Sequence, residues 1–233
     1  MWHLVACTLT FSGALKLQVA VVLAEATGLS LLWSNISVLL FALLLISPLL
    51  AWSGALFNPT ANVALLFSGH GQWSHNALRM VCQLVGAVIG SSAAVAFLPT
   101  SLQTTFPELS GSLLNGTDMQ QACVSEAGLS FVLNCFFLYS LAAKGSFNTF
   151  WLPMAATAGI VSVGSHYTGP SLNPAISLAW HLQHQKHSQW EHIVVYTVAP
   201  LVGAMFAGLL FSAMKSKAAK PVKVVVAAKN KDL

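Results

Sequence analysis

Charged side chains are scarce in this chain of 233 residues, where Asp, Glu, Lys and Arg together make up 7% of the sequence. Soluble proteins carry about 25% of such residues, so this chain lacks the charge that a water-solvated surface needs. Its 56% of hydrophobic residues and its mean hydropathy of +0.72 also exclude a disordered chain. The composition therefore predicts a protein that is embedded in a lipid bilayer.

The chain also lacks the patterns that most catalytic and metal sites need. Its four cysteines have no CxxC spacing and lie in apolar stretches, which indicates packed thiols rather than a zinc site or a disulfide framework. The sequence has no phosphate-binding loop, and no serine, cysteine or carboxylate pair with an orienting partner. Six of the ten cations lie in the last 19 residues, so the net charge of +4 belongs to a tail. We therefore expect no enzyme activity, no metal or other cofactor, and no nucleic-acid partner.

Long stretches without any charged residue mark the expected membrane crossings. They cover residues 26–78, 80–107, 127–143, 145–185 and 192–214. About 20 residues of helix cross a hydrocarbon core of about 30 Å. The predicted helices lie near residues 31–52, 77–98, 121–143, 148–165 and 191–214, with a further one from Met1 to about Leu23. Glycines inside these ranges are expected at close helix contacts: Gly86, Gly90, Gly203 and Gly208.

The two halves of the chain repeat one another. The run Gly-Ala-Leu-Phe-Asn-Pro-Thr-Ala from Gly54 matches Gly-Pro-Ser-Leu-Asn-Pro-Ala-Ile from Gly169, which begins 115 positions later. Three crossings in each half is an odd number, so the second half should insert upside down relative to the first. We expect one membrane domain over residues 1–214, with halves at about 1–98 and about 119–214, followed by a basic tail over 215–233.

Each half contains an Asn-Pro step that should begin a short helix. Asn is a good N-cap, and Pro suits the first helical position because the N–H there has no helical partner. The expected half-helices, near residues 59–68 and 174–183, are too short to cross, so each should enter the bilayer from its own side. Their N-termini then meet near the midplane, each with a charge of about +0.5, and the facing pair repels cations and protons.

The two boxes, Asn58-Pro59-Thr60 and Asn173-Pro174-Ala175, resemble those of the aquaporins, the major intrinsic protein family. The resemblance extends over nearly the whole chain and implies an all-α membrane fold, with six transmembrane helices and two re-entrant half-helices in an inverted repeat. It also implies a single-file pore in which Asn58 and Asn173 donate hydrogen bonds to water and interrupt proton relay. Thr60 departs from the usual Ala, and adds a hydroxyl and a β-branch where the boxes pack.

Four residues form a second constriction toward the outer mouth of the pore in this family. By their spacing from the boxes they correspond here to Val38, Val161, Pro170 and Ile176. Most aquaporins carry Arg at the position of Ile176, so this filter is wholly apolar and ion exclusion rests more heavily on the midplane dipoles. We expect slow water conduction, with other small neutral solutes as further candidates. The alternative is a non-conducting membrane scaffold or tetramer partner, in which these residues only pack a closed pore.

Glu126 is an acid inside the fourth expected crossing, where it should not face lipid. The resemblance implies that it braces the second re-entrant loop by accepting backbone N–H bonds. Because it has no evident partner and no second acid lies so deep, an ion-coupled transporter is disfavoured.

Glu126 precedes Asn173 by 47 residues, whereas Glu25 precedes Asn58 by 33, so Glu25 is expected in the first loop. Family spacing puts the first-helix acid before Met1, which indicates a truncated gene product or a shortened first crossing.

Several departures together resemble the plant small basic intrinsic proteins of the first type: Thr60, Pro170, Ile176, the run Trp190-Glu-His192 and the lysine-rich tail. That subgroup implies a water channel of the endoplasmic reticulum membrane, assembled as a homotetramer. The distribution of basic residues between short loops places both termini in the cytosol.

Two lysines of the tail suggest a sorting signal. Lys231 and Lys229 stand at the third and fifth positions from the carboxyl terminus and match a retrieval signal that coat-protein machinery reads. Contact between a basic tail and anionic membrane lipid is an alternative that does not exclude retrieval.

Several histidines of the sequence have both a functional and a simpler structural interpretation. Three histidines recur at every third position: His181, His184 and His187. We expect them to be solvent-exposed at a helix edge rather than to bind a metal. His70 and His75 flank the first re-entrant loop, where a plain polar loop is favoured over gating by protonation. Asn115 begins a glycosylation sequon in a loop that is expected in the lumen.

Overall fold

The computed structural model describes residue 56 and residues 58–97, 118–143, 146–164, 168, 171–183 and 190–218. Several predictions concern residues outside this set: the helices at 1–23 and 31–52, Glu25, Val38, Asn115, Pro170, His184, His187, Lys229 and Lys231.

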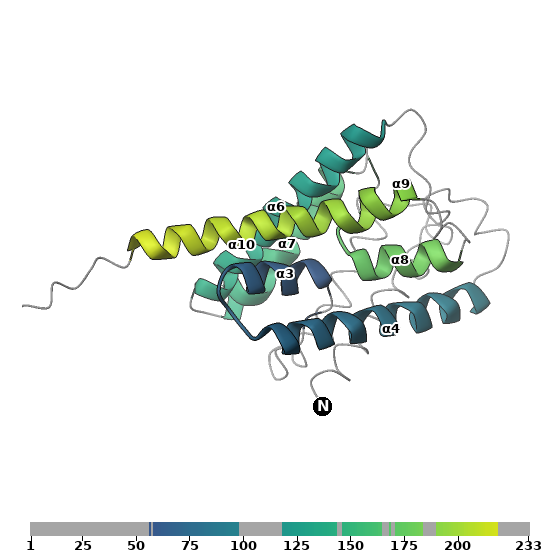
Figure 1. Ribbon diagram of the computed structural model, residues 1–233, viewed down its shortest axis with the longest axis horizontal. Coiled ribbons are helices and arrows are strands. Elements are labelled where there is room, and N and C mark those ends of the chain that lie inside the picture. The colour runs from purple at the N-terminus through teal and green to yellow at the C-terminus, as the bar shows by residue number, and fades with distance from the viewer. Residues whose placement is uncertain are drawn as a thin grey trace, which may run out of the picture.

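All regular structure in the described part is helical (Figure 1). The elements in chain order are α3 (Pro59–Phe67), α4 (Trp73–Phe97), α6 (Met119–Ala142), α7 (Ser146–Gly164), α8 (Pro174–Gln183), α9 (Trp190–Ile193), the π-helical turn η2 (Val194–Val198) and α10 (Ala199–Ala218). The last three run on without a break. These bounds agree with the predicted ranges to within a few residues, because charge-free length and N-cap chemistry are local signals.

The π-helical turn has a local cause in the sequence. Pro200 has no N–H and cannot donate to the carbonyl of Tyr196, and its ring would crowd that carbonyl in a regular helix. The chain widens just before the proline, where the N–H of Ala199 bonds the carbonyl of Val194, five residues back. The helix therefore continues from α9 to α10 across a proline that would otherwise break it.

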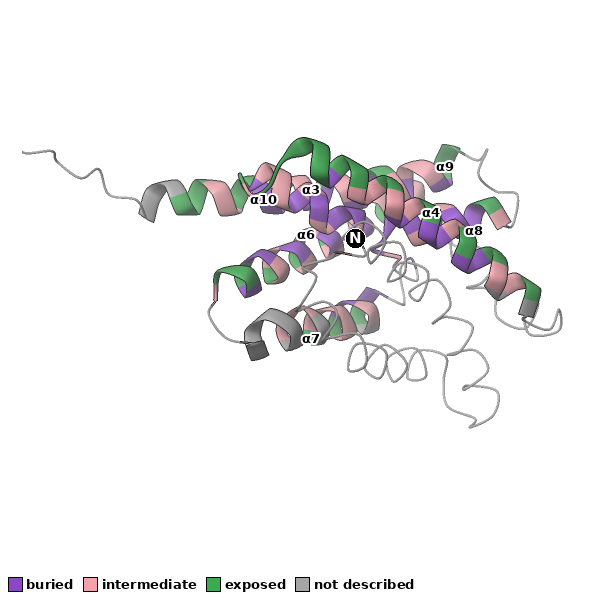
Figure 2. Cartoon of the chain, turned by 90° about the horizontal axis from the view of Figure 1, so that it is seen from below, coloured by how far each residue is buried: buried purple, intermediate pink, exposed green. Residues whose placement is uncertain are grey.

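Many of the exposed residues in Figure 2 are apolar, and many of the buried ones are polar. The outer face of α4 exposes an apolar stripe at helical spacing: Leu78, Val81, Val85 and Ile89. The interior holds fully buried polar side chains: Thr60, Asn62, Gln83, Glu126 and Ser130. Among the described helices, Met119–Ala142 and Trp190–Lys215 are long and apolar enough to cross a membrane. Apolar outside and polar inside is the distribution expected for a lipid-embedded chain.

The half-helix α3 lies between α10 and α4, and the half-helix α8 packs on α4 (Figure 1). Two glycines of α10 set how closely the helices approach. A Cβ on Gly203 would collide with the carbonyl oxygen of Ala127 on α6, and one on Gly208 would meet the carbonyl oxygen of Ala64 on α3. The predicted role of these two glycines in close helix contacts is therefore confirmed.

Candidate functional site: the paired Asn-Pro boxes

The first box begins α3 and also contacts the second half of the chain. The side-chain oxygen of Asn58 accepts the N–H of Thr60 at 3.0 Å, which is the N-cap interaction expected of an Asn before Pro. Its Nδ2 donates to the carbonyl oxygen of Leu172 at 2.8 Å. Leu172 directly precedes Asn173 of the second box. One asparagine therefore both caps its own half-helix and joins the two boxes.

The second box begins α8 with the same local chemistry. The side-chain oxygen of Asn173 accepts the N–H of Ala175 at 3.2 Å, and Asn173 is buried. The residue before it, Leu172, has a φ of 50°, a left-handed conformation that is costly for a residue with a branched side chain. This conformation lets the Leu172 carbonyl bond Asn58 while its N–H bonds Glu126.

The two half-helices meet at their N-terminal ends, which the Asn58–Leu172 bond holds together. The N-terminus of an α-helix carries a partial charge of about +0.5 from its aligned peptide dipoles. The two helix ends therefore contribute positive potential at the meeting point, and Glu126 is bonded to the loop just before the second box.

Glu126 of α6 holds the loop that precedes the second box. Its Oε1 accepts the hydroxyl of Thr168 at 2.8 Å and the N–H of Ser171 at 3.3 Å, and its Oε2 accepts the N–H of Leu172 at 3.3 Å. The hydroxyl of Tyr196 donates to the Thr168 carbonyl at 3.0 Å, which adds a contact from η2. The fully buried carboxylate thus accepts hydrogen bonds from three donors of a single loop.

Two amide side chains hold the corresponding part of the first half. Gln83 of α4 donates through Nε2 to the carbonyl of Leu56 at 2.8 Å. Its Oε1 accepts Asn62 Nδ2 at 3.0 Å, and the same nitrogen donates to the carbonyl of Asn58 at 3.2 Å. The sequence analysis did not single out this pair. The available signal was a glutamine in the middle of a charge-free crossing, since a polar side chain at that depth should face protein.

Thr60 lies fully buried in the first turn of α3. Its hydroxyl has no hydrogen-bond partner among the described residues. The corresponding residue of the second box, Ala175, carries no such polar atom and packs in an apolar cluster with Ala87 and Ala179. The departure from Ala therefore adds a polar atom, and a cost, to the first box.

Two of the four predicted filter residues are described. Ile176 lies in the first turn of α8 and packs, partly buried, against the cluster of Ala87, Ala175 and Ala179. Val161 lies in the last turn of α7 and is also partly buried.

The expectation that His181 is solvent-exposed was wrong. His181 is buried, and its ring lies 4.8 Å from that of His192 and 5.6 Å from that of Tyr196. Helix α8 packs on η2 and turns His181 toward His192 and Tyr196, which a spacing of three residues along one helix does not reveal. The described residues contain no group of three or more His, Cys, Asp or Glu that could hold a metal ion.

The profile of the major intrinsic protein family matches residues 4–211 of this chain. The chain therefore belongs to this family, whose members are passive membrane channels for water or small solutes.

Its curated relatives include plant proteins of the subgroup that the sequence resembles. The protein named Aquaporin SIP1-1 from Oryza sativa subsp. japonica is 34% identical over 189 residues, covering 78% of this chain and 74% of the relative. Aquaporin SIP1-1 from Arabidopsis thaliana is 30% identical over 209 residues, covering 86% and 84%. The predicted resemblance to this subgroup is thus confirmed.

A solved structure confirms the fold. The aquaglyceroporin from Plasmodium falciparum superposes with a TM-score of 0.67 over 93% of this chain and 95% of that one, at 18% sequence identity. The all-α, aquaporin-like membrane fold predicted from the sequence is therefore correct.

Proposed function

We propose that this protein conducts water passively through a single-file pore at the paired Asn-Pro boxes, and admits other small neutral solutes. The observation that carries the proposal is the hydrogen bond from Asn58 Nδ2 to the Leu172 carbonyl. It joins the two boxes at the point where both half-helices begin. Two capping asparagines at the meeting point of two positive helix ends supply donors for water and a barrier to cations.

The mechanism follows from the orientation of donors and dipoles. Each asparagine uses its side-chain oxygen to cap its own helix, so its amide nitrogen is the group that faces away from that helix end. The Asn58 amide nitrogen has two N–H groups, of which one bonds the Leu172 carbonyl and the other is the donor for water. Water that accepts from it must turn its own hydrogens away. Molecules on either side of the boxes then point in opposite directions, and a proton cannot pass along the file. The positive helix ends add an electrostatic cost for a hydronium ion.

The apolar filter of Val38, Val161, Pro170 and Ile176 sets the expected selectivity. Position 176 carries neither a fixed cation nor its hydrogen-bond donors, so water is stabilised less inside the filter. Less polar solutes, which gain little from such donors, are then at a smaller disadvantage relative to water. The pore should therefore conduct water slowly.

The channel domain extends over residues 1–214, and 215–233 form a tail; the family match ends near the same boundary, at residue 211.

Location and assembly follow from the subgroup resemblance. The protein is a homotetramer of the endoplasmic reticulum membrane, with both termini in the cytosol and Lys229 and Lys231 read by coat-protein retrieval machinery. The support is the similarity to the plant relatives and the lysine-rich composition of residues 215–233.

A non-conducting scaffold or tetramer partner is the second candidate. It is favoured by the apolar contact of the partly buried Ile176 with Ala87 of α4, and by the extra bulk of Thr60. Neither candidate is an enzyme, and neither needs a cofactor.

Osmotic shrinkage of proteoliposomes, followed by stopped-flow light scattering, distinguishes the two candidates. We expect a water permeability well above that of empty liposomes, and a return to the empty-liposome rate with Asn58→Asp plus Asn173→Asp, which removes the amide donors. Gln72→Glu makes the same amide-to-acid change in an exposed loop residue and should leave the rate unchanged. A rate equal to empty liposomes for folded wild-type protein would contradict conduction and favour the scaffold.

A further inference from the structure

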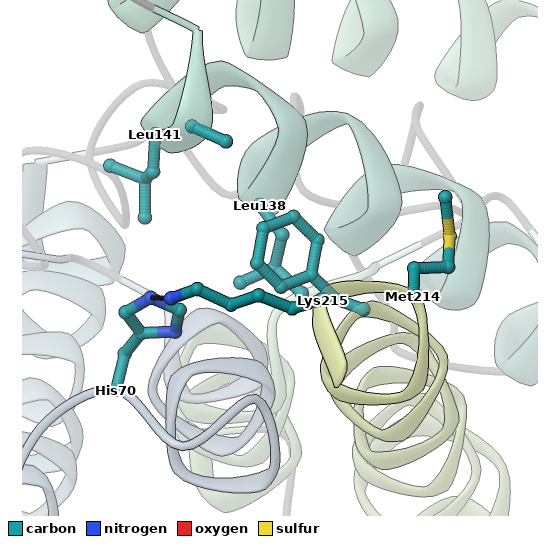
Figure 3. Close-up of a pocket in the computed structure, with 7 residues that line it drawn as sticks. His70, Leu138, Leu141, Met214 and Lys215 are labelled. Carbon is teal, nitrogen blue, oxygen red and sulfur yellow. Dashed lines mark hydrogen bonds between the residues drawn. The ribbon is translucent and has the colours of Figure 1, made fainter. Parts of the chain in front are cut away.

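A pocket of about 520 Å³ opens between the ends of α6 and α10 and the loop that follows α3 (Figure 3). Leu138 and Leu141 come from α6, Phe211 and Met214 from α10, and His70 from the loop. Lys215 of α10 extends across the pocket toward His70, as Figure 3 shows. The pocket is separate from the two boxes and shares no residue with them.

The polar end of this pocket has a defined hydrogen-bond direction. Lys215 can only donate, so at 3.1 Å His70 Nε2 must accept from it, and the other ring nitrogen carries the hydrogen. That N–H donates to Ser68 Oγ at 2.9 Å, and the serine hydroxyl donates to the Leu65 carbonyl at 3.0 Å. The chain of bonds holds the Lys215 ammonium in place and uses one of its three N–H donors. The other two donors remain for an anion.

The pocket lies at a membrane boundary. The two candidate membrane spans, Met119–Ala142 and Trp190–Lys215, both end at it. Lys215 is thus the first charged residue after an apolar span, at the depth where lipid headgroups begin. Below it the lining is apolar, and Leu141 and Met214 keep 49% and 62% of their surface exposed.

We propose that this pocket binds an anionic phospholipid of the leaflet that the C-terminal end of α10 reaches. The headgroup phosphate accepts from Lys215, and an acyl chain covers the exposed Leu141 and Met214. Charge complementarity carries the choice of ligand, since the described lining has one cation, one histidine and no acid. A soluble phosphate would satisfy the cation and leave the apolar wall uncovered. The proposal does not depend on whether the pore conducts.

Native mass spectrometry of the purified full chain with phosphatidylglycerol and phosphatidylcholine of equal acyl length tests the proposal. We expect the anionic lipid to bind at least about fivefold more tightly, which is the ratio that one basic side chain near a membrane surface supplies. Lys215→Gln should remove most of this preference. Arg79→Gln deletes an equal charge on α4, outside the described lining, and should change it less than twofold. Leu141→Gln should weaken both lipids together.

Three results would overturn the proposal. Equal affinity of the wild-type chain for the two lipids would remove the charge argument. An equal loss with Arg79→Gln would mean a diffuse basic surface. Displacement of the lipid by glycerol 3-phosphate at matching concentration would mean a phosphate site without an acyl contact. Lys215 is exposed, so its variant should keep the helical circular dichroism of the wild type, which checks that a loss of binding is not a loss of fold.

Discussion

The two Asn-Pro boxes start their half-helices in the same way but are held from outside by opposite chemistry. Glu126 holds the second box by accepting from Thr168, Ser171 and Leu172. Gln83 holds the first by donating to the carbonyl of Leu56. Each loop is held by the side chain that suits its free backbone groups: the loop with spare N–H groups meets a carboxylate, and the loop with a spare carbonyl meets an amide.

The largest expected effect comes from removing the carboxylate. Glu126→Leu leaves two buried donors and one partly buried donor without an acceptor, and each buried one costs about 1–3 kcal/mol. We expect the free energy of unfolding, measured by titration with denaturing detergent, to fall by about 3–5 kcal/mol, the summed cost of these unsatisfied donors. Glu191→Gln changes an exposed acid at the start of α9 and should have no measurable effect. A cost for Glu126→Leu below about 1 kcal/mol would mean that the loop finds other acceptors.

Removing the amide side chain of Gln83 should lower the free energy of unfolding by less than removing the Glu126 carboxylate. Gln83→Leu removes the donor to the Leu56 carbonyl and the acceptor for Asn62, which keeps its second bond to the Asn58 carbonyl. The same titration should show a loss of about 2–3 kcal/mol. Exposed Gln72, changed to Leu, provides the matched control. If Gln83→Leu costs as much as Glu126→Leu, the two braces are equivalent and the contrast between them fails.

The close contact between α10 and α6, next to Glu126, should be sensitive to one added methyl group. Gly203→Ala drives a methyl group against the Ala127 carbonyl, next to Glu126, and should cost about 1–3 kcal/mol in the free energy of unfolding. Gly159→Ala on α7 meets no atom within 4 Å and should be neutral or stabilising by up to about 1 kcal/mol. Equal effects for the two glycines would mean that α10 and α6 separate freely.

The smallest effect concerns Thr60. Thr60→Val keeps the shape of the side chain and removes a hydroxyl that lacks a partner among the described residues. We expect the free energy of unfolding to rise by up to about 1 kcal/mol, which would make the first box more like the second. A decrease instead would indicate that the hydroxyl has a partner beyond the described part of the chain.

The sequence alone determined the elements and their class. Charge-free stretches predicted α4, α6, α7 and α10, and the Asn-Pro steps predicted α3 and α8, because length, polarity and N-cap chemistry act within a few residues. The family resemblance drew attention to Glu126, whose partners the structure supplies.

The pairing of groups that are distant in the sequence depends on the packing of the helices. The bonds from Gln83 to Leu56 and from Asn58 to Leu172 join residues 27 and 114 positions apart, and the contact of Lys215 with His70 spans 145. The burial of His181 against His192 depends in the same way on how α8 lies against α9. Hydrogen-bond partners and burial are set by how helices pack, and no periodicity within one helix specifies which atoms of another helix it will meet.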